Sequence, residues 1–175
     1  MHNRKIALIG VILLTALTRF IPHPPNFTPV IAMGLFGGAY FSDKKFALLV
    51  PLLAMFLTDL FLGLHMTMAW VYAALILVVL MGFLLQGRIR FSTILGGSLG
   101  GALVFFLLTN LGVWMTGTGY HHPHTFAGLM AVYADGIPFF GNTLAGSLIY
   151  ATVLFAGFET VQRLVPELQL DPVRK

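Results

Sequence analysis

Long apolar stretches recur along this chain, and they constrain its fold more than any other feature. Such a stretch crosses the ~30 Å hydrocarbon core of a bilayer when it forms a helix of about twenty residues. Only 9% of the 175 residues are charged and 58% are hydrophobic, too few polar side chains to cover a soluble globule. The sequence therefore predicts an all-α membrane protein, in which residues 1–175 form a single domain with six transmembrane helices. The six stretches cover roughly residues 5–21, 28–42, 45–63, 67–86, 92–116 and 139–160.

The first two stretches each allow a second interpretation. The first has the basic start and apolar core of a signal peptide, but the residues around Arg19 offer no small-residue cleavage site, so we expect a retained span. The second gives only about 22 Å of helix at 1.5 Å per residue, which is short for a span. A re-entrant segment is its alternative.

The positive charges favour six spans. With both termini in the cytoplasm, nine of the ten Lys and Arg residues fall on the inner side, and only Arg19 falls on the outer side. Cytoplasmic loops carry such an excess of Lys and Arg. A re-entrant second segment would invert every later loop and remove this asymmetry. The cations are scattered and form no basic patch, so no nucleic-acid partner is expected.

The three connections on the predicted outer side are longer or more polar than the inner ones. They are residues 19–30 (RFIPHPPNFTPV), residues 62–67 (LGLHMT) and residues 117–138, and they hold five of the six histidines. Within the third, apolar residues follow Thr125 at helical intervals. This pattern predicts a short amphipathic helix over residues 125–134, in the outer loop between spans five and six, lying at the interface or folded back as a lid.

Asp59 lies about one turn inside the third span. An ionisable group at mid-membrane costs about 2.5–3.5 kcal/mol on insertion scales, so it usually faces protein or water. Arg19, the only outer cation, is the candidate partner for a structural ion pair that would anchor the proline-rich segment to the third span. Exposure of Asp59 to a functional, water-filled site is the other interpretation.

The outer histidines suggest a metal site, because transition metals favour imidazole ligands. However, no carboxylate or cysteine adjoins His121, His122 and His124 in the sequence, and Pro123 restricts the backbone, so a polar interfacial loop is favoured. His65 is either a ligand contact or a solvated turn residue. No catalytic motif such as GxSxG, HExxH or a phosphate loop occurs, so neither an enzyme nor a cofactor is expected.

Small residues spaced by four allow helices to approach closely in lipid. Packing within the chain is the favoured interpretation, and a groove for a partner membrane protein is the alternative. The pairs are Gly34 with Gly38, Gly96 with Gly100, Gly97 with Gly101, and Gly141 with Ala145.

Four segments carry a resemblance to known proteins. They are RFIPHPPNFTPVIAMGLFGGAYF (19–41), TDL (58–60), TNLGVW (109–114) and GIPFFGNTLAGSL (136–148). They resemble a small bacterial membrane-protein family of uncharacterised function. That family is similar in size and layout to the substrate-binding S-components of energy-coupling-factor (ECF) vitamin transporters, including the solitary cobalamin-type members. The resemblance implies a multi-pass protein of the bacterial inner (cytoplasmic) membrane.

The resemblance also implies a ligand cavity beneath the three outer connections. Two features of S-components are missing here: the alanine pair spaced by four in span one, and the cysteine that some cobalamin-type members place near cobalt. The implied ligand contacts are His23, Asn26, Phe27, His65, Asn110, Trp114, Tyr120 and Asn142.

Together these features predict a component that binds a small, vitamin-like organic micronutrient on the outer side and helps to carry it inward. Energy would come from a coupling subunit with ATPases or from downhill flow. Two alternatives stay open. One is a transition-metal carrier or sensor that uses the outer histidines. The other is a scaffold subunit that only packs against partner membrane proteins.

Overall fold

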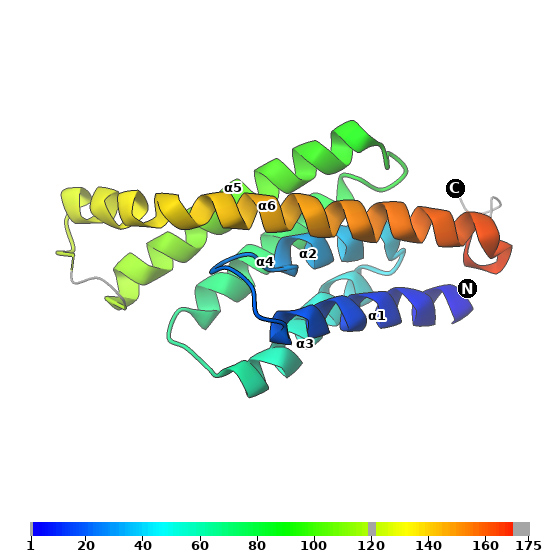
Figure 1. Ribbon diagram of the computed structural model, residues 1–175, viewed down its shortest axis with the longest axis horizontal. Helices are drawn as coiled ribbons and strands as arrows, with labels where there is room; N and C mark the ends of the chain where they lie inside the picture. The colour runs from blue at the N-terminus through cyan, green and yellow to red at the C-terminus, as the bar shows by residue number, and fades with distance from the viewer. Residues whose placement is uncertain (1, 119–121, 170–175) are drawn as a thin grey trace.

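The computed structural model describes residues 2–118 and 122–169, and every regular element in them is helical (Figure 1). The prediction of an all-α fold is therefore confirmed. Two 3-10 turns, η1 (Thr18–Phe20) and η2 (Pro166–Leu168), accompany six α-helices: α1 (His2–Leu17), α2 (Val30–Tyr40), α3 (Lys44–Leu62), α4 (Met68–Phe83), α5 (Phe91–Thr116) and α6 (Phe126–Leu164).

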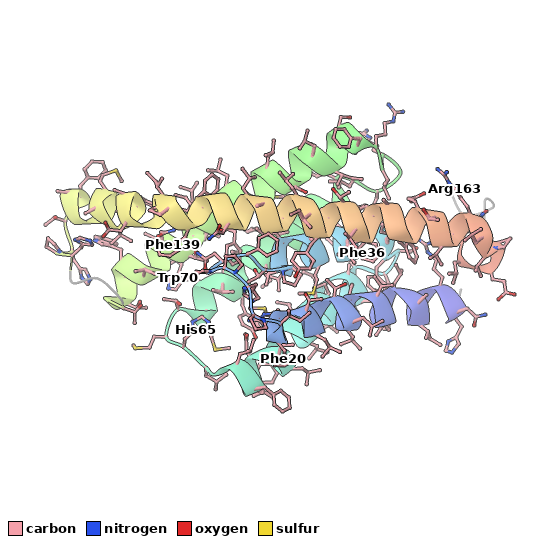
Figure 2. All side chains as sticks on the ribbon, viewed as in Figure 1. Phe20, Phe36, His65, Trp70, Phe139 and Arg163 are labelled. Atoms are coloured by element: carbon pink, nitrogen blue, oxygen red, sulfur yellow. The ribbon has the colours of Figure 1, made fainter. Side chains whose placement is uncertain are left out.

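Three of these helices, α3, α5 and α6, are long and apolar enough to cross a membrane, and α2 and α4 are shorter apolar helices. The bundle has two ends. α1 begins and α6 ends at one of them, called the Arg4 end, and the connection between α3 and α4 lies at the other, called the His65 end (Figures 1 and 2). Large apolar side chains remain exposed along the helices between the two ends, as expected for a surface that contacts lipid.

α2 forms the centre of the bundle. All eleven of its residues are buried, and it contacts each of the other five α-helices. Its last turn carries an aromatic cluster, in which the Phe36 ring lies 5.5 Å from that of Phe155 and 5.4 Å from that of Phe158. A helix that is apolar all round is expected to be buried in this way. At about 16 Å, α2 is roughly half as long as a ~30 Å membrane core is thick.

Glycines let α2 and α4 approach closely. A Cβ atom on Gly38 would lie 2.7 Å from the Cα atom of Gly82, and one on Gly34 would lie 2.9 Å from side-chain atoms of Leu75 and Val78. These positions pack helices within the chain, as predicted. Gly96 and Gly141 differ, because a Cβ atom there would meet no other atom within 4 Å.

The predicted short helix over residues 125–134 is not a separate element. Its start is as predicted, since the Thr125 Oγ1 accepts a hydrogen bond from the Gly128 N–H at 3.2 Å. The helix then continues as the 39-residue α6, with Pro138 inside it. Proline removes one backbone hydrogen bond but does not forbid a helix whose neighbours hold it in place. Here Tyr133 donates a hydrogen bond to the Leu107 carbonyl of α5 at 2.9 Å.

The proline-rich connection between η1 and α2 runs along α6. The Asn142 side chain donates a hydrogen bond to the Pro25 carbonyl at 3.0 Å, and a Cβ atom on Gly146 would lie 3.0 Å from the Thr28 nitrogen. The Phe27 ring packs against Tyr150, with 5.8 Å between centroids. Non-helical backbone is tolerated at membrane depth where protein covers it or where it lines a water-filled cavity.

Candidate functional site

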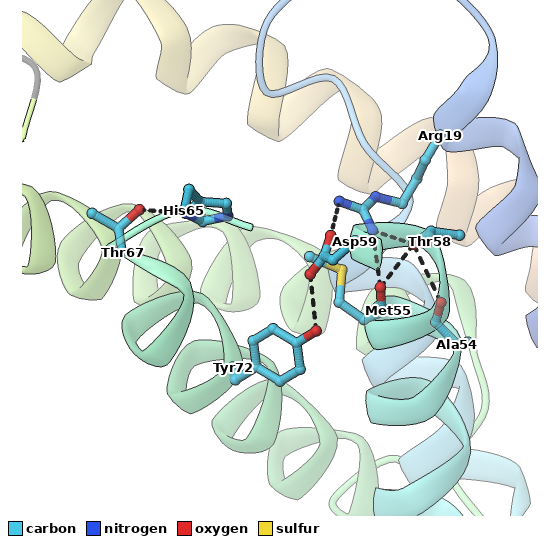
Figure 3. Close-up of polar contacts among 8 residues, drawn as sticks. All are labelled: Arg19, Ala54, Met55, Thr58, Asp59, His65, Thr67 and Tyr72. Atoms are coloured by element: carbon cyan, nitrogen blue, oxygen red, sulfur yellow. Dashed lines mark hydrogen bonds and ion pairs between the residues drawn. The ribbon is translucent and has the colours of Figure 1, made fainter. Parts of the chain in front are cut away.

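The predicted ion pair is present at the His65 end. The Arg19 Nη2 lies 2.7 Å from the Asp59 Oδ1, and the two side chains are only 11% and 2% exposed. The Arg19 Nη1 also donates to the Met55 carbonyl at 3.3 Å and to the Thr58 hydroxyl. Tyr72 donates a hydrogen bond to the second oxygen of Asp59 at 2.8 Å (Figure 3). The network therefore ties η1, α3 and α4 together.

A cavity of about 360 Å³ lies between the helices at this end. This volume falls within the range of about 300–1,000 Å³ that small-molecule sites occupy. One part of its wall is apolar, formed by Phe105, Phe106, Phe139, Val30, Met55, Val71, Val113, Val132 and Gly136. The polar part is formed by Arg19, Asn26, Thr28, His65, Thr67, Thr109, Asn110, Asp135 and Thr143.

Three of the predicted ligand contacts line this cavity, namely Asn26, His65 and Asn110. Asn26 has a φ of 63°, a left-handed conformation that asparagine adopts more readily than most residues. The His65 Nδ1 lies 2.8 Å from the Thr67 hydroxyl, which fixes the ring at the cavity wall. The Asn110 amide donates to the Phe106 carbonyl at 2.8 Å.

Four other predicted contacts are not among the residues that line the cavity, and three of them, Phe27, Trp114 and Asn142, hold the surrounding connections in place. Phe27 and Asn142 fasten the proline-rich connection to α6 through the contacts given above. The Trp114 indole donates to the Pro123 carbonyl at 3.1 Å, and the His23 Nδ1 lies 3.0 Å from the Pro24 carbonyl. Tyr120, the eighth predicted contact, lies outside the described residues.

Asp135 lines the cavity although the sequence did not single it out as a contact. Its Oδ2 lies 2.7 Å from the His122 Nε2, so a histidine of the last connection reaches the cavity wall through this carboxylate. The sequence could have pointed to Asp135, because acidic residues are rare on the predicted outer side. Asp135 and Asp59 are the only ones in the three predicted outer connections and the adjacent ends of the spans.

The two described histidines of the last connection, His122 and His124, have separate partners. His122 pairs with Asp135, whereas the His124 ring packs against Trp114 with 5.2 Å between centroids. Among the described residues no three His, Asp or Glu side chains are grouped closely enough to hold a metal ion. His121 lies outside those residues.

We expect Asn142→Ala to lower the free energy of unfolding by about 0.5–1.5 kcal/mol, because it removes the hydrogen bond to the Pro25 carbonyl. Thermal unfolding of the purified protein measures the loss. Thr152→Ala is the matched control on the same helix, since its hydroxyl bonds only the Leu148 carbonyl one turn earlier in the part of the chain described. Equal effects of the two substitutions would contradict the fastening role of Asn142.

The apolar helices are those of a helical membrane protein, and a cavity with a partly polar wall lies at one end of the bundle. The chain belongs to a family of unknown function (DUF6580), whose model matches residues 1–168. Comparisons with curated proteins and with solved structures gave no match.

Proposed function

We propose that the protein is a membrane-embedded component that binds a small organic micronutrient from the outer side and carries it inward. The observation that carries this proposal is the cavity of about 360 Å³ at one end of the bundle, which residues of the first two predicted outer connections line together with residues of α2 to α6. Aromatic rings and neutral polar groups together are typical of small-molecule sites, in which apolar walls supply affinity and a few polar groups fix orientation.

The proposed topology has six spans, with both termini in the cytoplasm of a bacterium and the His65 end outside. The distribution of positive charge supports it, because cations accumulate on the cytoplasmic side of membrane proteins. Only Arg19 among the Lys and Arg residues described lies at the His65 end. The other seven lie at or near the Arg4 end of their helices: Arg4, Lys5, Lys44, Lys45, Arg88, Arg90 and Arg163.

The cavity wall indicates the chemistry of the ligand. Its charged groups already have partners, since Arg19 forms an ion pair with Asp59 and the Asp135 Oδ2 lies 2.7 Å from the His122 Nε2. The remaining polar groups are mainly hydroxyls and amides, which donate and accept hydrogen bonds without charge. The site therefore favours a compact molecule with an aromatic or other flat apolar part and several uncharged polar groups. Some vitamins are molecules of this kind.

Transport against a gradient requires an energy source. By analogy with S-components of energy-coupling-factor transporters, a coupling subunit with ATPases would supply it, and downhill flow is the alternative. In both cases this chain acts as the binding and translocating unit.

A thermal-shift screen of the purified protein against vitamins and transition-metal ions tests the proposal. A ligand present at 100 times its Kd is expected to add about 2.7 kcal/mol to the free energy of unfolding. Stabilisation by at least one organic compound is the expected result. Stabilisation by a metal ion alone, or by nothing in the screen, would overturn the proposal.

A further inference from the structure

A second polar cavity, of about 370 Å³, lies at the Arg4 end of the bundle. It is bounded by the start of α1, the end of α2, the connection between α4 and α5, and the end of α6. Its wall resembles that of the first cavity in combining arginine, carboxylate, amide and hydroxyl groups. The residues that line it are Arg4, Ala39, Tyr40, Gly87, Ile89, Glu159, Gln162, Arg163 and Gln169.

Arg4 is the centre of this second site. It is only 6% exposed, which is unusual for an arginine at the start of a helix. Its Nη1 donates to the Gln162 Oε1 and to the Leu168 carbonyl, both at 2.6 Å, and its Nη2 donates to the Tyr40 carbonyl at 3.2 Å. A buried charge is retained only where such partners compensate its desolvation. The buried Arg4 and its partners therefore form a polar site at this end of an otherwise apolar bundle.

Both ends of the bundle contain a hydrogen bond between a tyrosine and a carboxylate near an arginine. At the Arg4 end, the Tyr40 hydroxyl donates to the Glu159 carboxylate at 2.6 Å, beside the buried Arg4. At the His65 end, the Tyr72 hydroxyl donates to Asp59 at 2.8 Å, and Asp59 pairs with Arg19. Arg4, Tyr40 and Glu159 all line the second cavity, whereas only Arg19 of its group lines the first. The two arginines lie near opposite ends of α1.

α2 lies between the two cavities. Its first residue, Val30, lines the cavity at the His65 end, and Ala39 and Tyr40 in its last turn line the cavity at the Arg4 end. The apolar barrier between Val30 and Ala39 is therefore about 14 Å long at 1.5 Å per residue, compared with a membrane core of ~30 Å. The middle of α2 closes this barrier, since Ala32, Met33, Leu35 and Phe36 are all 0% exposed.

We propose that the cavity at the Arg4 end is a second solute site, which opens to the cytoplasm and accepts the same class of compact molecule, with a flat apolar part and uncharged polar groups. In this arrangement the apolar core around α2 separates the entry site from the exit site of one translocation path. The inference rests on the proposed function for its ligand class and direction, but the existence of a water-accessible inner cavity is tested independently of any ligand.

Site-directed cysteine labelling tests this proposal directly, because the natural chain has no cysteine. The probe is a small sulfonate-bearing methanethiosulfonate, which does not cross membranes, applied to sealed vesicles of either orientation. Ala39→Cys reports the second cavity, and Thr109→Cys reports the first. Ala32→Cys is the matched control, since it lies two turns from Ala39 on the same face of α2 and lines neither cavity. Ile89→Cys replaces Ala39→Cys if the latter does not fold.

We expect Ala39→Cys to react only from the cytoplasmic side, and about tenfold or more faster than Ala32→Cys, because thiol reactivity follows exposure to water. Thr109→Cys should react only from the opposite side. Failure of Ala39→Cys and Ile89→Cys to react from the cytoplasmic side, with Thr109→Cys still accessible, would overturn this inference alone. Equal reaction of Ala32→Cys would also overturn it, because α2 would then be no barrier. Failure of Thr109→Cys to react would instead contradict the outer cavity on which the proposed function depends.

Discussion

Replacing Asp59 with alanine is expected to lower the free energy of unfolding by about 3–5 kcal/mol, because it leaves a buried arginine without its counter-charge. Asp59 is 1% exposed, and its carboxylate accepts from Arg19 at 2.7 Å and from Tyr72 at 2.8 Å. No other acidic side chain forms an ion pair with Arg19 among the described residues. Thermal or denaturant unfolding of the purified protein measures the loss.

A double-mutant cycle distinguishes the energy of the Arg19–Asp59 interaction from other effects of each substitution on stability. Arg19→Ala removes the other charge, so the double variant should lose much less than the sum of the two single losses. Asp43→Ala is the matched control for a carboxylate at the membrane boundary. It removes only a helix cap, in which the Asp43 Oδ1 accepts from the Lys45 N–H at 2.9 Å, and should cost about 1 kcal/mol. Additive losses for Arg19 and Asp59 would mean that the pair contributes nothing.

The second large effect is expected at the contact between α2 and α4. Gly38→Ala should lower the free energy of unfolding by about 1–3 kcal/mol or more, because the new methyl group would overlap the backbone of Gly82 rather than a flexible side chain. The two helices must separate to accept it, and α2 contacts all the other helices. Gly38→Val should lower the yield of folded protein further. Thermal unfolding and size-exclusion chromatography measure both effects.

Gly96→Ala provides the matched control, since a Cβ atom there meets no atom within 4 Å. Alanine is favoured over glycine inside a helix by about 0.5–1 kcal/mol, so this variant should be as stable as the natural protein or slightly more so. A similar loss at Gly38 and Gly96 would contradict the close packing of α2 against α4.

Features of the fold that depend on polarity could be predicted from the sequence. The helical class follows from the apolar stretches. The Arg19–Asp59 pair follows from the small number of charged residues on the predicted outer side, since each of the two had few alternative partners. The uninterrupted α6 could not be predicted in the same way. The proline at position 138 and the glycine at position 136 are typical of a break. In the structure this part of α6 packs against α5, where the Asn110 side chain lies beside Gly136, and the helix is continuous.

The candidate site was predicted in part, for a similar reason. A sequence shows which polar residues lie near a cavity, but not which of them already have partners. Asn26, His65 and Asn110 line the cavity, whereas Asn142 uses its amide on the Pro25 carbonyl and Trp114 uses its indole on the Pro123 carbonyl. Asparagine and tryptophan side chains can either bind a ligand or hold a connection in place. Only the three-dimensional contacts show which of these roles a given residue has.

The most direct test of the central claim is a binding measurement on a variant whose outer cavity is filled. Thr109→Phe places a ring in the cavity wall, whereas Leu103→Phe adds a similar ring on the lipid-facing side of the same helix, where Leu103 is 49% exposed. For the organic compound that stabilises the natural protein most, titration should show that Thr109→Phe raises the Kd about tenfold or more, a loss of at least 1.4 kcal/mol. Leu103→Phe should leave the Kd unchanged. Unchanged binding by a folded Thr109→Phe variant would contradict the assignment of the cavity as the ligand site.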